Sequence, residues 1–168
     1  GIKHLRVPTT DDISVNMGKV LDENEEITAS VEGKIWNGYN INVGNPHAVV
    51  FVEKIEDVGS LEVAPIVRPK DSYPEGVNVE FVEILPGREA KMRVHERGSG
   101  ETKSCGTGTC AVALAATLHS KETLPSRWVI YPPGGRLVVD IDPHSNATLT
   151  GPALLISDHD ITQYLQEA

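Results

Sequence analysis

The chain has 168 residues, of which 39% are hydrophobic and 23% are charged, as is usual for a globular protein that fits one domain. Its 15 Lys and Arg residues against 24 Asp and Glu residues give a formal net charge of -9. This charge argues against nucleic-acid partners and against an anionic membrane surface, because both require a concentrated basic face. The chain has no apolar run of about 18 residues, and its two cysteines are too few for a disulfide framework, which favours a cytoplasmic location.

Short runs of β-forming residues, separated by Pro, Gly and Asn, occupy most of the chain. In chain order, the predicted strands are Ile13 to Met17, Tyr39 to Val43, Ala48 to Val52, Val77 to Ile84, Glu89 to His95, Trp128 to Tyr131, Arg136 to Ile141 and Ala153 to Ile156. The turn residues Pro132 to Gly135 predict a hairpin or corner between two of these strands. A short helix is expected between Asp57 and Val67, ending before Pro69.

The segment from Gly106 to His119 breaks the β pattern. It reads GTGTCAVALAATLH and is small and apolar on nearly every face, which predicts a buried helix. Side chains this small allow strands to pack closely on several sides, so we expect an α+β fold with strands wrapped around a central buried helix. We expect residues 1–157 to form this domain and residues 158–168 to form a terminal segment with helical spacing of its apolar residues.

Cys105 lies immediately before the predicted helix and is the candidate centre of the chemistry. The N-terminus of a helix carries unpaired N–H groups and about half a positive charge, so we expect a lowered pKa for this thiol. The Gly-Thr-Gly-Thr sequence that follows would let a bound carboxylate approach the backbone N–H groups. The competing interpretation is an inert cysteine beside a turn. Cys110, inside the helix, is interpreted as a small core residue.

Two further polar clusters are candidates for a site. Asn45 and His47 lie in a turn at the beginning of a predicted strand and offer an amide and an imidazole. Glu96 and Arg97 follow the end of another strand, where they suit an ammonium group and a carboxylate respectively. Taken alone, the residues of the first cluster are more often structural, and the second cluster is equally typical of a surface ion pair.

Five short motifs occur in order along most of the chain. They are Val15 to Gly18, Gly44 to His47, Gly76 to Val79, Glu96 to Thr102 and Ser104 to Thr109. The ordered set resembles the diaminopimelate epimerase family, most specifically in Glu-Arg-Gly-Ser-Gly-Glu-Thr followed by Ser-Cys-Gly-Thr-Gly. This resemblance implies a protein of two pseudosymmetric halves, each with strands around a central helix. It also implies an active site in the cleft between the halves, with one catalytic cysteine from each.

The resemblance further implies an isomerase that converts LL-diaminopimelate to its meso form for lysine and peptidoglycan precursor synthesis, with no cofactor and no metal. The implied partners are this small substrate, the amino-terminal half that carries the second cysteine, and a second copy in a homodimer. These 168 residues alone are then expected to be inactive. The implied acid/base is Cys105, assisted by His47 and Glu96. The implied substrate contacts are Asn45, Asn78, Glu96, Arg97, Gly106 and Thr107.

Three alternatives remain open at this point. A proline racemase-like or hydroxyproline epimerase-like enzyme would share the fold and the cysteine pair but bind a ring. A cysteine hydrolase would need a histidine, such as His47 or His95, to activate Cys105 for attack on a carbonyl group. A non-catalytic binding domain would use the same pocket without turnover.

Overall fold

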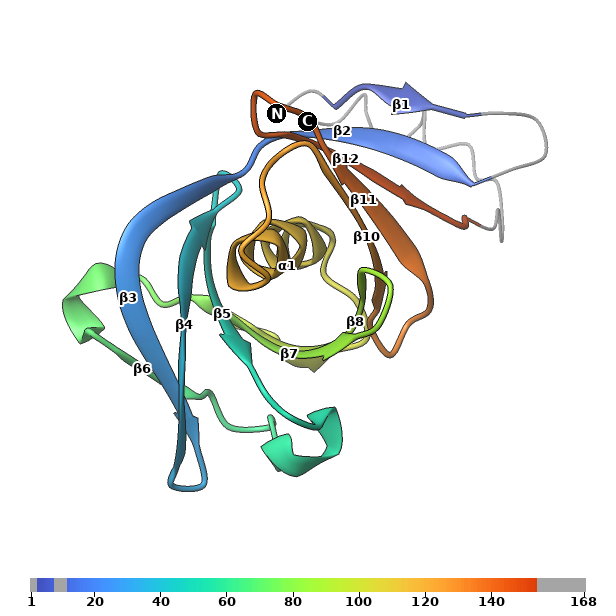
Figure 1. Cartoon of the computed structure of the whole chain (residues 1–168). Helices are drawn as coiled ribbons and strands as arrows, with labels where there is room; N and C mark the ends of the chain where they lie inside the picture. The colour runs from blue at the N-terminus through green and yellow to red at the C-terminus, as the bar shows by residue number, and fades with distance from the viewer. Residues whose placement is uncertain (1–2, 8–11, 154–168) are drawn as a thin grey trace, which may run out of the picture.

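The computed structural model describes residues 3–7 and 12–153, in which twelve strands form one strongly curved sheet (Figure 1). The strand order is β1-β2-β12-β11-β10-β8-β7-β5-β4-β3-β6, and β9 pairs with β8 outside this path. The strands are β1 (Leu5–Arg6), β2 (Ile13–Lys19), β3 (Leu21–Val31), β4 (Lys34–Asn42), β5 (Pro46–Phe51), β6 (Ile66–Arg68), β7 (Asn78–Leu85), β8 (Glu89–Glu96), β9 (Gly100–Thr102), β10 (Ser126–Tyr131), β11 (Leu137–Ile141) and β12 (Asn146–Gly151). All pairs are antiparallel except β5 with β7 and β8 with β10.

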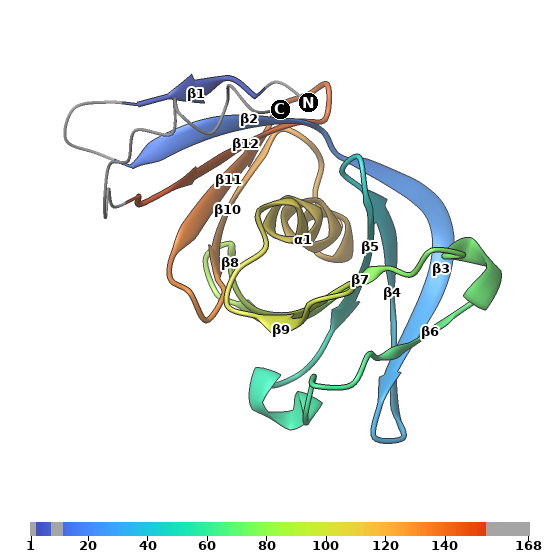
Figure 2. The ribbon, with the colours of Figure 1, turned by 180° about the vertical axis from the view of Figure 1, so that it is seen from behind.

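Helix α1 (Gly106–His119) runs through the middle of the curved sheet, and Figure 2 shows strands around it from the opposite side. Its ten consecutive residues from Gly108 to Thr117 are buried, and it contacts strands from both halves of the sheet, including β4, β7, β10 and β12. The prediction of an α+β fold with strands around a central buried helix is therefore confirmed. No helix within residues 3–7 and 12–153 combines the length and the hydropathy that crossing a membrane requires.

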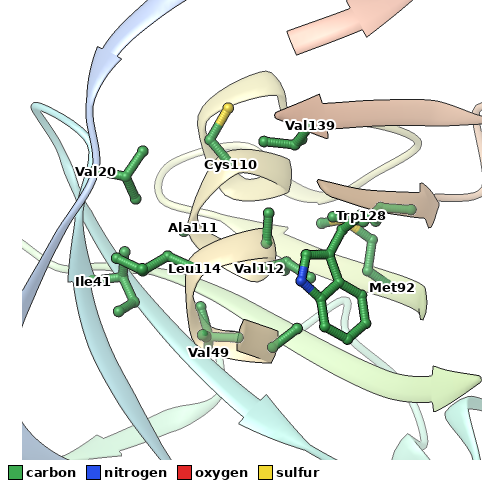
Figure 3. Packing of buried hydrophobic residues seen from close by; sticks show 14 of the residues in the cluster. Val20, Ile41, Val49, Met92, Cys110, Ala111, Val112, Leu114, Trp128 and Val139 are labelled. Atoms are coloured by element: carbon green, nitrogen blue, oxygen red, sulfur yellow. The ribbon is translucent and has the colours of Figure 1, made fainter. Parts of the chain in front are cut away.

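The sheet has a hydrophobic core on each side. The inner core surrounds α1, where Trp128, Met92 and Val139 pack against the helix (Figure 3). The outer core lies on the far side of the sheet and includes Phe81 and Leu61. Because successive side chains of a strand point to opposite faces, one strand such as β7 contributes to both cores. This alternation decides which polar residues of β5, β7 and β8 face the beginning of α1.

Most predicted strands are confirmed, but the helix expected between Asp57 and Val67 is wrong. A 3₁₀ turn covers Ile55–Val58, and the chain then reaches β6, which pairs with β3. Gly59 has a positive φ of 84°, which ends the turn.

The outcome at the C-terminal end of the chain is partial. The last described strand is β12, and Ala153, the first residue of the predicted last strand, is not in a strand. The remainder of that predicted strand and the terminal segment 158–168 lie outside the described residues.

Candidate active site

Cys105 caps the beginning of α1. Its backbone is extended, with φ of -131° and ψ of 113°, and its Sγ accepts a hydrogen bond from the backbone N–H of Gly108 at 3.4 Å. The sulfur thus takes the place of the side-chain oxygen that usually satisfies a free N–H group in the first helical turn. The Cys105 carbonyl oxygen accepts from both the backbone N–H and the hydroxyl of Thr109. These bonds fix the sulfur at the end of the helix.

The environment of Cys105 changes the expectation for its pKa. The residue is only 7% exposed, and burial raises the pKa of the thiol to about 11. Hydrogen bonds from Thr107 and Gly108 lower it, while the nearby carboxylates of Glu80 and Glu96 raise it further. The expected lowered pKa is therefore wrong for this structure, because desolvation outweighs the donors at the helix end.

A chain of hydrogen-bonded side chains leads away from Cys105 into the sheet. The Cys105 Sγ lies 3.6 Å from the Thr107 Oγ1, and Asn45 donates through Nδ2 to that oxygen at 3.3 Å. Asn45 Oδ1 lies 3.2 Å from His47 Nε2. His47 Nδ1 then lies 2.6 Å from Glu80 Oε1. The structure thus joins Cys105, Thr107, Asn45 and His47, four residues proposed from the sequence, in one chain.

Glu80, at the far end of this chain, was not among the residues proposed from the sequence. Both its side chain and that of His47 are 0% exposed. The parallel register places Glu80 beside Val49 and His47 beside Asn78, so the two strands direct His47 and Glu80 to the same face of the sheet. The available signal was a lone acidic residue in the otherwise apolar run Val79 to Val82. Burial of that run makes its carboxylate unusual.

Gly108 allows the Glu80 carboxylate to reach the helix. A Cβ at position 108 would lie 2.6 Å from Glu80 Oε1 and 3.3 Å from Cys105 Sγ. Since real Cβ atoms do not approach other atoms as closely as 2.6 Å, only glycine fits between this carboxylate and the helix backbone. The first turn of α1 therefore packs directly on both the sulfur and the carboxylate.

Glu96 and Arg97, which the sequence suggested as a recognition pair, have separate partners. Glu96 Oε1 accepts a hydrogen bond from the Thr102 hydroxyl, and its charge acts on Cys105. The backbone N–H of Arg97 donates to Asn78 Oδ1 at 2.9 Å, which fixes the Asn78 amide. Glu96 therefore lies near the thiol, while Arg97 approaches the site through its backbone.

The Arg97 side chain extends along a different surface. It packs over Gly76, and its Nη1 donates to the Glu75 carbonyl oxygen at 3.1 Å. It also lines a cavity of about 440 Å³ together with Arg68 and Lys70. In this structure the guanidinium is thus held by Glu75 and faces this cavity.

The arrangement at the beginning of α1 suits proton transfer beside a bound anion. The first-turn N–H groups of Gly106 and Thr107 have no carbonyl partner within the helix, which makes them donors for a carboxylate next to the thiol. Within residues 3–7 and 12–153, no three His, Cys, Asp or Glu side chains gather as a metal ion would require.

Neither candidate histidine is arranged as the base of a cysteine hydrolase. Both ring nitrogens of His47 are occupied, by Glu80 and by Asn45. His95 is bonded through Nδ1 to the Leu61 carbonyl oxygen, at 2.8 Å, toward the outer core.

Comparison with known sequences gives a consistent result. A family model described as diaminopimelate epimerase matches residues 39–156. A diaminopimelate epimerase of Streptomyces coelicolor is 40% identical over 163 residues, which cover 94% of this chain and 56% of that protein. One from a Geobacillus species is 40% identical over 123 residues, covering 73% of this chain and 43% of that protein. The chain thus spans about half the length of the curated relatives that it matches.

Comparison with solved structures shows a shared fold at low sequence identity. A hydroxyproline epimerase from Agrobacterium vitis has a TM-score of 0.66 at 15% identity, with 92% of this chain and 55% of that chain covered. A phenazine biosynthesis protein of the PhzF family from Bacillus anthracis has a TM-score of 0.65 at 13% identity, with 92% of this chain and 62% of that chain covered. These similarities concern the arrangement of strands around the helix.

Proposed function

This chain belongs to the diaminopimelate epimerase family, and from that premise we propose that it supplies one half of an active site that converts LL-diaminopimelate to the meso form without pyridoxal. The observation that carries the proposal is the position of Cys105 as the cap of a buried helix, linked by hydrogen bonds to Asn45 and His47. Such a thiol can exchange a proton with a carbon atom held next to the helix end.

The reaction needs two proton-transferring groups on opposite faces of the substrate Cα. Cys105 supplies one of them, and a second cysteine from the other half of the protein supplies the opposing one. Because burial raises the pKa of Cys105 to about 11, this thiol is protonated at neutral pH in the structure. In that state it acts as the acid, and the opposing thiolate removes the substrate proton. The two groups exchange roles in the reverse direction.

Removal of the proton leaves a carbanion at the substrate Cα, which the site must stabilise. The N–H groups of Gly106 and Thr107 hold the reacting carboxylate, where preorganised donors in a water-poor site stabilise the developing charge. Asn45, Asn78 and the Glu96–Arg97 segment hold the distal amino-acid group. For Arg97 this requires its guanidinium to leave the Glu75 carbonyl oxygen. His47 and Glu96 orient and tune the thiols.

The wider assignments follow from the family. We propose a cytoplasmic enzyme of lysine and peptidoglycan precursor synthesis that works as a homodimer and needs no cofactor. The 168-residue chain by itself has no turnover, because one of the two proton-transferring thiols is contributed from elsewhere.

The test compares the two cysteines in the full-length protein that contains this chain. Incorporation of solvent deuterium at Cα of LL-diaminopimelate measures proton exchange directly. Cys105→Ala is expected to abolish exchange, while Cys110→Ala retains it, because Cys110 is fully buried in the inner core. Equal losses in both variants would contradict the role of Cys105. Exchange on free proline or hydroxyproline, with none on diaminopimelate, would instead assign the ring-binding activity considered above.

A further inference from the structure

We propose that Glu80 is a positioning residue that keeps His47 as an imidazolium and thereby sets the direction of the hydrogen-bond chain that ends at Cys105. The inference rests on the proposed function only for its catalytic consequence. Its evidence is the geometry of the hydrogen-bonded side chains from Glu80 to Cys105, and its tests use no epimerase activity.

The first step is the buried contact between His47 and Glu80. Their Nδ1 and Oε1 atoms are 2.6 Å apart, shorter than the roughly 2.9 Å of an ordinary N–H···O bond, and charge-assisted bonds are the shorter class. Both side chains are 0% exposed, and an ionised carboxylate in such a place is tolerated only with a charged partner. Glu80 Oε2 has no hydrogen-bond partner among the described residues, so His47 is the group that balances it.

The second step is the other nitrogen of His47. Nε2 lies 3.2 Å from Asn45 Oδ1, and an amide oxygen is only an acceptor. Nε2 must therefore carry a proton to make this bond. Since Nδ1 also donates, to Glu80, both ring nitrogens are donors, and His47 is an imidazolium.

The third step follows the protons to the sulfur. With its oxygen turned to His47, Asn45 donates through Nδ2 to the oxygen of Thr107. The Thr107 hydroxyl then has its own proton free to point at Cys105 Sγ, 3.6 Å away, where it stabilises a thiolate. A neutral His47 with a bare Nε2 would still donate to Glu80 through Nδ1, but every bond between Nε2 and Cys105 would reverse. Asn45 would turn over, Thr107 would donate to the amide, and the sulfur would meet a lone pair that favours the S–H form.

The position of Glu80 against α1 makes the arrangement rigid. Its Oε1 occupies the space that a side chain at Gly108 would fill, so the carboxylate lies between the imidazole and the first helical turn. The titratable groups around these hydrogen-bonded side chains are Glu80 from β7, Glu96 at the end of β8, Cys105 and Cys110 from the helix, and Tyr73, whose pKa is raised by burial and also by the Glu80 charge. Of these, only Glu80 contacts the imidazole.

The first test reads the protonation of His47 directly. In the 168-residue chain labelled with ¹⁵N-histidine, NMR at neutral pH is expected to show both His47 ring nitrogens protonated. In Glu80→Gln, which keeps the shape but removes the charge, one nitrogen is expected to lose its proton. A neutral His47 in the unaltered chain would overturn the proposal, and this measurement needs no variant to fold.

The second test measures the effect at Cys105. The alkylation rate of this thiol is followed by mass spectrometry as a function of pH. Glu80→Gln removes a negative charge near the sulfur, but His47 loses its positive charge with it, so the lost hydrogen bond from Thr107 decides the result. Cys105 is expected to react roughly three- to ten-fold more slowly at a given pH, which corresponds to the loss of one hydrogen bond. Glu83→Gln, on the same strand but bonded to the Ile55 backbone, is the matched control and should leave the rate unchanged. An unchanged rate in Glu80→Gln would overturn the proposal.

A double-mutant cycle separates this role from general loosening of the fold. Thr107→Val removes the last link, so adding Glu80→Gln to it is expected to cause no further slowing. If Glu80→Gln slows alkylation equally with and without Thr107, the effect does not travel through the chain and the proposal fails. Failure here leaves the epimerase assignment intact, whereas loss of that assignment leaves these protonation results unchanged.

Discussion

The first turn of α1 and the remainder of the same helix are buried in the same sheet, yet they are built for different tasks. Cys105, in the cap, accepts a bond from Gly108 and lies beside the Thr107 hydroxyl. Cys110 is 0% exposed and lies in the apolar inner core (Figure 3). Burial raises the pKa of both thiols, to about 11 for Cys105 and about 12 for Cys110. The two thiols differ because Cys105 has polar groups beside its sulfur, namely the Gly108 N–H and the Thr107 hydroxyl.

The two ends of α1 extend this contrast. Near the C-terminal end, the Thr117 hydroxyl donates to the Ala113 carbonyl oxygen, and the Trp128 indole donates to Thr117 Oγ1. That network is satisfied within itself and serves stability. The network at the N-terminal end finishes at a carboxylate oxygen of Glu80 without a described partner. Buried polar atoms without a partner are few in folded proteins, so this one requires an explanation other than stability.

The largest expected effect comes from the apolar part of the helix. Leu114→Ala is expected to lower the free energy of unfolding by about 2–5 kcal/mol, because it leaves a cavity between α1 and the strands around it. The native fraction should keep the Cys105 alkylation rate, since no polar link passes through Leu114. Urea denaturation and alkylation measure the two properties. A changed alkylation rate of Cys105 in Leu114→Ala would contradict the independence of the two parts of the helix.

An intermediate effect is expected in the first turn. Gly108→Ala is expected to cost about 1–3 kcal/mol of unfolding free energy, because its Cβ would collide with Glu80 and crowd Cys105. It should also change the alkylation rate of Cys105. Gly106→Ala is the matched control. Its Cβ would lie 3.3 Å from the end of the flexible Leu149 side chain, so the change should be under about 1 kcal/mol. Equal costs in the two variants would contradict the packing of Glu80 on Gly108.

The smallest effect is that of Cys105 ionisation on the free energy of unfolding, which is absent at neutral pH and appears in alkaline solution. Burial raises the pKa of the Cys105 thiol from its ordinary value of 9.0 to about 11 in the folded protein. The unfolded chain therefore loses the proton first, and the stability that burial of the neutral thiol contributes is lost as the pH rises from about 9 through about 11. Urea midpoints for the chain and for Cys105→Ala across this range measure the difference. A midpoint that falls identically in both would show that Cys105 contributes nothing.

The parts of the fold with a uniform pattern were predictable from the sequence. Gly106 to His119 is apolar on every face, so both its helical state and its burial were predicted correctly. Strand β3 was missed, because its first half, Leu21 to Glu26, is largely acidic and the alternation of buried residues begins only at Ile27. Its pairing with β4 and β6 is a tertiary effect that local pattern does not report.

The candidate site also has a part that was predictable from the sequence and a part that was not. Cys105, Asn45 and His47 were proposed as separate motifs, but their connection through Thr107 spans 62 residues of sequence and depends on strand register. Glu80 was missed because the strand pattern does not tell which acidic residue points inward. The predicted lowering of the Cys105 pKa was wrong. The sequence shows that the thiol lies at a helix N-terminus, which lowers the pKa, but it does not show the burial that raises it.

The pairing of β2 with β12 has a consequence for how the molecule is made. Residues 13–19 and residues 146–151 are hydrogen-bonded neighbours, so β2 is synthesised more than 120 residues before its partner strand. Until then, α1 has only the strands that precede it for cover, and one edge of β2 stays unpaired and open to other strands. Contacts so distant in sequence slow folding. Closure around the helix is thus a late event, and the cap at Cys105 reaches its final surroundings only when nearly the whole described chain has been synthesised.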